Sequence, residues 1–373
     1  MSNELNICHV SLGHHPLDDR IYYKECLSLA KKYSNITLVA PNKGSICESS
    51  NIKFSLFKET KYFQNIKTAY LVAKEHDANI YHIHEFELLP LFLWLKIRYG
   101  KKIIYDAHES VYHYFLAFSR RPFWLIWPIA VIAHLVERIC SAFVNRIITV
   151  SPWLVDSFKN YNKKVSLICN FPLLEHFETK SFDKGINPII LYTGQISPSR
   201  NIDLIVESMK EVKKKFPNAK LLLIGNSICW FKGQLLGIIE KNNLENNVKI
   251  KAAIPYNQIP QLMKSVSIGM GAMAPNKFLK PAIQVKVFEY MLCKLPVISA
   301  RVPSTELFVE QNKCGILIDD VSKNSIADGI IRILENPGLA TEMGENGYQA
   351  VQQKYNWQKM EDELLQIYSE VSE

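Results

Sequence analysis

Two polar segments of this sequence combine residue types that can bind or activate a substrate. The first is YDAHES, residues 105–110, in which His108 follows an apolar run and can hydrogen-bond a hydroxyl or carbonyl group. The second is TGQISPSR, residues 193–200, where a tight turn brings Arg200 to the start of a helical pattern. Backbone amides at a helix start, together with a guanidinium, favour an anion such as a diphosphate.

A third segment, QVKVFEYMLCKLPVIS at residues 284–299, places Lys286 and Glu289 three positions apart, on one face of a predicted helix. A carboxylate at that place can accept two hydrogen bonds from a ribose diol, as an acidic residue does in dinucleotide folds. Each segment also has an ordinary interpretation. His108 can be a structural histidine, the turn can be a capped turn with a surface arginine, and Lys286 with Glu289 can be a surface ion pair.

Several catalytic signatures are absent from the sequence. The segment after the first predicted strand, SLGHHPLDDR, holds only Gly13, so no G-x-G-x-x-G fingerprint for a nicotinamide dinucleotide exists there. A phosphate-binding G-x-x-x-x-G-K-[ST] loop, G-x-S-x-G and H-E-x-x-H are also missing. The eight Cys lie at least 18 residues apart, which excludes a C-x-x-C zinc or redox pair and indicates reduced thiols.

The elements that position these residues follow a repeating order of strand, helix and strand. Short apolar runs alternate with longer segments of helical period, a pattern typical of parallel sheets with crossover helices. In the first half, the predicted strands are 5–10, 36–40, 80–84, 103–106, 147–150 and 165–169. In the second half they are 189–193, 220–224, 248–251, 267–270, 296–299 and 315–318. We expect an α/β protein with two Rossmann-like doubly wound domains that face a central cleft.

The segment 170–188, NFPLLEHFETKSFDKGINP, has two Pro, one Gly and no sustained period, and we interpret it as an interdomain linker. The first domain is therefore expected to span 1–175, and the second is expected to span 186–354. A C-terminal helix at 355–373 is expected to pack back on the first domain.

Composition and charge are those of a soluble globular protein. The 373 residues are 48% hydrophobic and 21% charged, which excludes a disordered or collagen-like chain. The net charge is +8, and the first 180 residues hold 22 Lys and Arg against 16 Asp and Glu. This bias fits a weak attraction to anionic lipid, nucleic acid or a phosphorylated substrate, as well as a plain solvated surface. The N-terminus lacks the pattern of a secretory signal, so we expect a cytoplasmic protein.

One segment, PFWLIWPIAVIAHLV at residues 122–136, is uncharged between Arg121 and Glu137. At 15 residues it is shorter than the roughly 20 needed to cross a bilayer. It is either a buried or half-buried helix of the first domain, or a helix that lies in the membrane surface. In the second case Trp124 and Trp127 would lie at the level of the lipid headgroups, beside flanking arginines.

The motifs together resemble a known family. TGQISPSRNIDLIVESM, FEYMLCKLPVIS and ELFVEQNKCGILI, with YDAHES and RIITVS upstream, resemble family 4 of the retaining nucleotide-sugar glycosyltransferases, which have the GT-B fold. Each motif is loose by itself, but five in this order are specific. The segment HHPLDDRIYYKE is similar to the opening of a branch that makes bacterial surface polysaccharides.

The resemblance implies a metal-independent transfer of a sugar from a nucleoside diphosphate sugar, with retention of configuration. It also implies that the first domain, 1–175, binds the acceptor and that the second, 186–354, binds the nucleotide sugar. Arg200 matches the basic residue that binds the donor diphosphate, and Lys286 matches a common basic position. Glu289 matches the glutamate that contacts the donor ribose, and His108 matches the histidine near the donor sugar; we expect both to act in catalysis. Glu306 matches a recurring acidic position on the donor side.

Other positions of the family pattern lie on the loop after the first strand or depart from the pattern. Gly13 is expected to approach the donor phosphates, and His14 and Asp18 are expected on the acceptor side. Gln195 follows the glycine of the diphosphate turn, where a basic residue is common, and is expected to line the donor site. Pro281 stands eight positions before Glu289, where many members carry a second glutamate that reads the donor sugar.

The resulting hypothesis is a cytoplasmic hexosyltransferase that uses a UDP-sugar or GDP-sugar and needs no cofactor or metal. Its acceptor is expected to be a lipid-linked saccharide for a bacterial surface polysaccharide such as capsule or O antigen. The protein is expected on the inner face of the membrane, through residues 120–138, and not on nucleic acid. The alternatives are a nucleotide-sugar epimerase of the same fold and a catalytically degenerate membrane-assembly protein.

Overall fold

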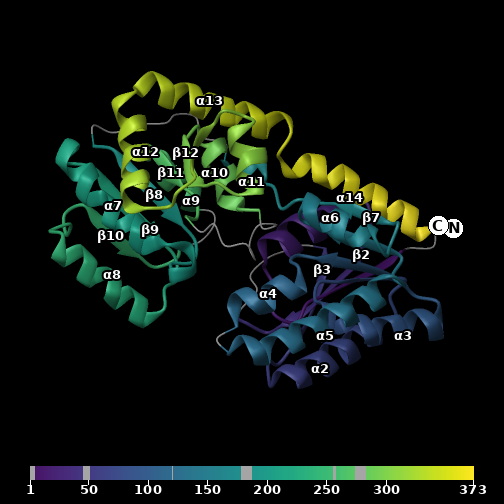
Figure 1. Ribbon diagram of the computed structural model, residues 1–373. Helices are drawn as coiled ribbons and strands as arrows, with labels where there is room; N and C mark the ends of the chain where they lie inside the picture. Colours follow the sequence, from purple (N-terminus) through teal and green to yellow (C-terminus); the bar gives the residue numbers. More distant parts are fainter. Residues whose placement is uncertain (1–4, 45–50, 120, 178–186, 255–257, 274–282) are drawn as a thin grey trace. The chain divides into compact units, whose positions relative to one another are not determined.

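The computed structural model describes residues 5–44, 51–119, 121–177, 187–254, 258–273 and 283–373. The chain forms two compact units. Unit 1 comprises residues 1–170 and 357–373, and unit 2 comprises residues 171–356. Each unit holds one sheet with parallel pairing throughout its described strands, covered by helices (Figure 1).

Unit 1 contains a seven-stranded sheet with the order β3-β2-β1-β4-β5-β6-β7. The strands are β1 (Asn6–Val10), β2 (Asn35–Pro41), β3 (Ile52–Phe57), β4 (Ile80–Ile83), β5 (Lys102–Ala107), β6 (Arg146–Thr149) and β7 (Val165–Leu167). Six of them were predicted and β3 was not. Its sequence, IKFSLF, buries only Ile52 and Phe57, because an edge strand has a neighbour on one side only.

Unit 2 contains a six-stranded sheet with the order β10-β9-β8-β11-β12-β13. Its strands are β8 (Ile189–Thr193), β9 (Lys220–Ile224), β10 (Val248–Lys251), β11 (Ile268–Met270), β12 (Val297–Ala300) and β13 (Gly315–Ile318), all of which were predicted. Both sheets therefore have the doubly wound Rossmann order. The order reverses beside β1 and β4 in unit 1 and beside β8 and β11 in unit 2, where such sheets bind ligands.

The helices of unit 2 bury one apolar stripe each. On α7 (Ile202–Lys215), Ile202, Ile205, Val206, Met209 and Val212 are fully buried, at helical spacings of three and four. The other helices are α8 (Cys229–Lys241), α9 (Ile259–Met263), α10 (Val285–Leu292), α11 (Pro303–Thr305), α12 (Lys323–Glu335) and α13 (Pro337–Gln353), with the short turns η3 (Leu174–Phe177), η4 (Pro198–Arg200) and η7 (Glu306–Glu310).

Unit 1 carries both ends of the chain. Its helices are η1 (Asp19–Cys26), α1 (Leu27–Ala30), α2 (Tyr62–Glu75), η2 (Phe86–Leu88), α3 (Leu89–Tyr99), α4 (Val111–Phe118), α5 (Phe123–Ser141), α6 (Pro152–Lys159) and the C-terminal α14 (Trp357–Ser372), yellow in Figure 1. In α14, Trp357 is fully buried and its indole nitrogen donates to the Ser28 hydroxyl at 2.9 Å.

The passage from unit 1 to unit 2 lies earlier than the domain end expected at residue 175. Phe171 already belongs to unit 2, because its ring packs against Phe288, Phe308 and Tyr355, with ring centroids 4.9, 6.1 and 5.5 Å away. The contact of Phe171 with three other aromatic rings of unit 2 therefore fixes this segment in unit 2, although its sequence is irregular. Residues 178–186 of the expected linker lie outside the described residues.

Candidate functional site

In unit 2, a glycine turn at the end of β8 forms the centre of the site. Gly194 follows Thr193 with a φ of +117°, a conformation that residues with a side chain rarely adopt. After it, η4 presents Arg200 and α7 begins at Ile202. Gly225, at the end of β9, lies so close that a Cβ there would be 1.7 Å from the Gly194 carbonyl oxygen. Two glycines thus let the ends of β8 and β9 meet.

Lys286, on the first turn of α10, lies against this glycine turn. Its Nζ would be 3.0 Å from a Cβ at position 194, so glycine there keeps room for the ammonium group. The same Nζ lies 3.8 Å from the centre of the Tyr192 ring, in a cation–π contact. Burial, with a contribution from Arg200, lowers the pKa of Lys286 to about 7, against the opposing effect of Glu289. Two cations thus crowd one turn, an arrangement that an anion would relieve.

The side chains after Lys286 on α10 fix the helix to the sheet. Glu289 is only 6% exposed, so it is not the surface carboxylate of the ordinary interpretation. The Tyr290 hydroxyl accepts from the Thr193 backbone nitrogen at 3.0 Å, and its ring fills the space beside Gly269. Gln284 Oε1 accepts from the Ala272 nitrogen at 2.7 Å. These bonds hold Lys286 and Glu289 at the carboxyl edge of the sheet.

A cavity of about 420 Å³ opens at the same edge, entirely within unit 2. It begins at the glycine turn and continues over the ends of β9 and β10, lined by Thr193, Gly194, Gln195, Ile224, Gly225, Asn226, Ala253, Ile254 and Ile259. Its volume falls in the usual range for small-molecule sites. Three isoleucines suit a flat apolar group, and the turn presents backbone polar groups beside them.

Of the other residues expected on the donor side, Gln195 lies at the cavity and Glu306 is not among the residues that line it. Gln195 lines the cavity, and its carbonyl oxygen accepts from the Tyr192 hydroxyl at 3.0 Å. Glu306 lies at the start of η7, with a half-exposed side chain 3.7 Å from Arg301. Pro281 lies outside the described residues.

In unit 1, the loop after β1 gathers the residues expected on the acceptor side. The Gly13 nitrogen donates to Glu85 Oε1 at 3.2 Å, and His14 Nδ1 lies 3.1 Å from Asp18 Oδ2. Asp18 also caps η1 by accepting from the nitrogens of Arg20 and Ile21. Burial alone would lower the pKa of His14, but the bond to Asp18 and nearby carboxylates outweigh it, so the pKa is raised.

His108, after β5, is held by a buried ion pair. Its Nε2 lies 3.0 Å from Asp106 Oδ2. Arg20 clamps both oxygens of Asp106 at 2.9 and 3.0 Å and donates a third bond to the Ile168 carbonyl oxygen at 2.8 Å. Burial would raise the pKa of Asp106, yet Arg20 and His108 hold it well below its usual range. An ionised carboxylate only accepts, so His108 donates from Nε2 and its Nδ1 remains an acceptor when the ring is neutral.

The helix η1 reaches this ion pair because it is wound as a π-helix. The Tyr23 nitrogen bonds back five residues to the Asp18 carbonyl oxygen at 3.3 Å. Residues five positions apart then lie on the same face of the helix, and Arg20 and Glu25 are one such pair. Asp19 and Lys24 are another, and they form an ion pair at 2.6 Å. In an α-helix, positions five apart lie about 140° from one another. The winding therefore brings Arg20 and Glu25 to the sheet together.

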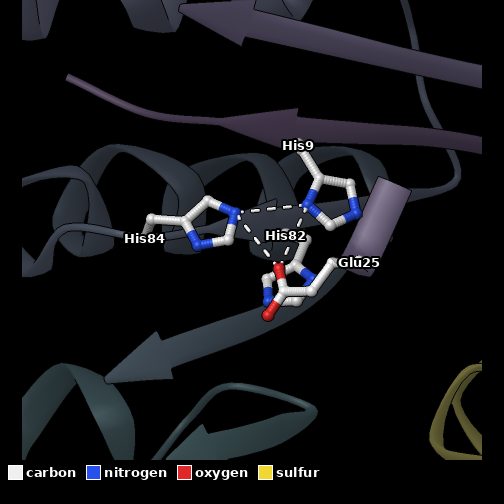
Figure 2. Close-up of side chains that lie close together, drawn as sticks. All are labelled: His9, Glu25, His82 and His84. Carbon is white, nitrogen blue, oxygen red and sulfur yellow. Dashed lines mark hydrogen bonds and ion pairs between the residues drawn. The ribbon is translucent and has the colours of Figure 1, made fainter. Parts of the chain in front are cut away.

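Behind the ion pair lies a fully buried cluster formed by His9, Glu25, His82 and His84 (Figure 2). His9 Nδ1 lies 3.2 Å from His84 Nε2, and Tyr368 bridges His9 and His82 at 3.1 and 2.7 Å. Burial lowers the pKa of all three histidines and raises that of Glu25. The cluster is therefore held neutral, which is the cheaper state for buried groups.

By donor type, these four side chains could hold a divalent cation, since their ligand atoms lie within 4.8 Å of one another. However, Arg20 Nε already lies 3.0 Å from Glu25 Oε1. A cation bound there would have to take the proton from Glu25 and lie beside a fixed guanidinium. The fixed guanidinium and the hydrogen bonds through Tyr368 fit a structural cluster better than a metal centre.

Each unit thus brings most of its predicted residues together. Gly13, His14, Asp18 and His108 share the carboxyl edge of one sheet, where the His14 and His108 rings lie 5.2 Å apart, and Arg200, Lys286 and Glu289 share that of the other. Sequence reasoning missed Arg20, Glu25, Glu85 and Asp106 in unit 1 and Tyr290 in unit 2. The alternation of His82 and His84 on one face of β4 was a usable signal.

Family models match both units. One described as glycosyl transferases group 1 matches residues 176–350, and one described as glycosyltransferase family 4 matches residues 27–171. Curated relatives are distant. Alpha-D-kanosaminyltransferase of Streptomyces kanamyceticus is 23% identical over 49% of this chain and 46% of its own. Poly(ribitol-phosphate) alpha-N-acetylglucosaminyltransferase of Staphylococcus aureus is 27% identical over 52% of this chain and 36% of its own. The matched stretches span about half or less of these relatives.

Solved structures share the fold along almost the whole chain. Sucrose-phosphate synthase from Thermosynechococcus elongatus has a TM-score of 0.78 at 19% identity and covers 98% of this chain and 99% of its own. HepE of Anabaena, solved in complex with UDP and glucose, has a TM-score of 0.76 at 14% identity and covers 98% of this chain and 99% of its own. With a glycosyltransferase model on each unit and this fold throughout, the chain belongs to family 4 of the glycosyltransferases with the GT-B fold.

Proposed function

We propose that this protein is a retaining hexosyltransferase that moves a sugar from a UDP-sugar or GDP-sugar to a lipid-linked saccharide, without a metal ion or cofactor. The observation that carries the proposal is the glycine turn of unit 2. There, Lys286 and Arg200 stand beside a cavity of about 420 Å³. The cations suit a diphosphate, and the cavity suits a nucleobase, so together they have the parts of a nucleoside diphosphate site.

The reaction needs charge stabilisation more than covalent chemistry. The bond from the anomeric carbon to the diphosphate oxygen breaks, and its electron pair stays on that oxygen. The acceptor hydroxyl forms the new bond on the same face, and its proton passes to the departing phosphate. Arg200 and Lys286 stabilise the charge that develops there, while Glu289 holds the ribose. In this scheme Arg200 and Lys286 together supply the positive charge for which other transferases use a metal.

Unit 1 is proposed to bind the acceptor and the sugar being transferred. His108 presents a ring nitrogen that Asp106 and Arg20 hold in place, and Nδ1 can accept a hydrogen bond from a sugar hydroxyl. Gly13, His14 and Asp18 lie on the same edge and would face the acceptor. The relative from Staphylococcus aureus is named as a poly(ribitol-phosphate) alpha-N-acetylglucosaminyltransferase. We extend this to surface polysaccharide synthesis, such as capsule or O antigen, in the cytoplasm.

The helix α5 supports membrane contact through residues 120–138. Among the described residues it is the helix whose length and composition would allow a span, and it spans Phe123–Ser141, where the uncharged segment 122–136 was expected to be helical. One side of α5 packs on unit 1, where Ile126 and Ala130 are buried, so the half-buried form of the first alternative stays open, but the helix is not fully buried. Trp124 is 71% exposed and Ile132 is 62% exposed. A row of exposed aromatic and aliphatic side chains is typical of helices that lie in a membrane surface, so we propose peripheral binding to the inner face.

Binding of nucleotides tests the donor site. UDP, GDP, ADP, CMP and their sugar conjugates are added to the full chain, and the unfolding temperature is measured. A ligand at 100 times its Kd stabilises a protein by about 2.7 kcal/mol, so a UDP or GDP series should shift the transition by several degrees. No shift with any nucleotide would contradict the proposal and favour a degenerate binding protein. Product formation from the donor alone, without an acceptor, would favour an epimerase.

Vesicle sedimentation tests the membrane contact. The double variant Trp124→Ser with Trp127→Ser should release the protein from vesicles of phosphatidylglycerol and phosphatidylcholine, because both indoles are exposed on α5. Trp230→Ser is the matched control, since Trp230 is also exposed, at 58%, but belongs to unit 2. Unchanged sedimentation of the double variant would contradict the contact.

A further inference from the structure

Unit 1 contains a second cavity, larger than that of unit 2 and of different character. Its volume is about 710 Å³, and we call it the α5 pocket. Its walls come from α2, η2, α4 and α5, and include Phe63, Phe86, Phe115, Ile126, Ile129 and Ile132. The surface is mainly hydrocarbon, which suits an apolar ligand of considerable length. Of these elements, α2, α4 and α5 are labelled in Figure 1, and α4 packs directly on α5.

The α5 pocket adjoins the polar edge proposed for the acceptor. Phe86 directly follows Glu85, whose carboxylate accepts from Ser11 at 2.8 Å and from Gly13 at 3.2 Å. On the other wall, α4 begins three residues after His108. The chain therefore places the apolar walls and the polar residues in immediate succession at two neighbouring strand ends. A ligand with a polar head at Gly13 and His108 has an apolar space within reach for its tail.

The charges around the α5 pocket favour a phosphate at its margin. Glu87 lines the pocket, but its carboxylate accepts from the Tyr62 hydroxyl. Arg121 also lines it and is exposed, so its guanidinium is available to an anion. It precedes α5, whose exposed tryptophans are proposed to face the membrane. The pocket thus has an apolar interior, a cation at its margin and an exposed apolar helix beside it.

We infer that the α5 pocket binds the hydrocarbon chain of the lipid-linked acceptor, with the phosphate of that lipid at Arg121 and its saccharide at His108. The inference rests on the proposed function, because it takes the acceptor to be lipid-linked. It adds that the lipid leaves the bilayer in part and enters the protein. A bulk phospholipid is a poorer occupant, since it brings no saccharide to the polar edge that the pocket adjoins.

The test uses farnesyl phosphate, a soluble isoprenoid phosphate, and measures its binding to the full chain by calorimetry. The wild-type protein should bind it, and farnesol or inorganic phosphate alone should bind at least tenfold more weakly. Ala133→Trp, which places an indole in the pocket, should weaken the binding at least tenfold. Ile139→Trp is the matched control on α5, because Ile139 is 62% exposed and outside the lining, and should change the binding less than twofold.

Two results would overturn the inference: equal binding of farnesyl phosphate by Ala133→Trp and wild type, or binding of farnesol or inorganic phosphate that is as tight as that of farnesyl phosphate. Circular dichroism establishes that each variant is folded. The UDP-induced shift in unfolding temperature is measured on the same samples and should be unchanged in Ala133→Trp, since the donor cavity lies in unit 2. If UDP shifts the unfolding temperature but the farnesyl phosphate results fail, only the assignment of the α5 pocket is wrong. If no nucleotide shifts the unfolding temperature, the proposed function is wrong.

Discussion

The two sheets have the same strand order, but the chemistry at their carboxyl edges is opposite in kind. In unit 1 the edge is built from titratable side chains, and Arg20, Asp106, His84 and Glu25 are all buried. In unit 2 it is built from a glycine turn and backbone groups, with Lys286 and Arg200 only partly buried beside an open cavity. One topology thus supports a buried ion pair with neutral neighbours in one unit and an open binding site in the other.

This contrast predicts where mutations act. Buried charges depend on every partner, because an unpaired one loses its solvation without compensation. Partly buried cations around an open cavity cost little when removed, since water replaces their partners. Substitutions at the edge of unit 1 should therefore lower stability, whereas substitutions at the edge of unit 2 should lower binding and turnover with little change in stability.

The largest expected effect is at the buried ion pair. Arg20→Ala should lower the free energy of unfolding by about 3 to 5 kcal/mol, because it leaves the buried Asp106 carboxylate without the guanidinium that clamps both of its oxygens. Urea unfolding followed by circular dichroism measures it, and Asp106→Asn provides a milder variant of the same pair. Lys31→Ala is the control, since Lys31 is 64% exposed in its pair with Glu361 and should cost less than about 1 kcal/mol. An equal loss of unfolding free energy in Arg20→Ala and Lys31→Ala would contradict the contrast between buried and exposed ion pairs.

The next effect separates stability from turnover. Glu289→Ala or Arg200→Ala should lower turnover at least about tenfold, equivalent to about 1.4 kcal/mol in transition-state stabilisation, while Arg200→Ala leaves urea unfolding nearly unchanged. Arg332→Ala, an exposed arginine on α12 of the same unit, is the control and should retain its activity. Normal rates in both site variants would contradict the site in unit 2.

The smallest effect concerns pH and sharpens the role of Lys286. Its pKa of about 7 lies below the ordinary 10.5, so the free protein loses this charge as the pH rises through 7. A diphosphate prefers the charged form, so affinity for UDP should fall severalfold from pH 7 to pH 9. The stability of the free protein should move the other way, because the unfolded chain still binds that proton between pH 7 and 10.5.

The matched variant for the pH experiment is Lys286→Arg. An arginine stays charged over this range, so its pH profile for UDP binding should be flat between pH 7 and pH 9. Calorimetric titrations at four pH values suffice. An equally steep decline in Lys286→Arg would assign the titration to another group.

The sequence predicts unit 2 better than unit 1 for a physical reason. Arg200, Lys286 and Glu289 lie on single strand–turn–helix segments, where local spacing decides which side chains reach the strand end. The unit 1 network joins residues far apart in the chain, since Arg20 and Asp106 are separated by 86 positions. No local pattern predicts that pairing. The strand β3 was missed because it is an edge strand with little buried surface.

The winding of η1 has a consequence for insertions and deletions. In a π-helix each backbone bond joins residues five positions apart, one position more than in an α-helix. Removing a single residue between Arg20 and Glu25, such as Tyr23, would leave each of the two pairs four positions apart. An ordinary α-helix places residues with that spacing on one face. A deletion, normally among the most damaging changes to a buried helix, would here return the segment to regular winding while Arg20 still reaches Asp106 and Lys24 still reaches Asp19.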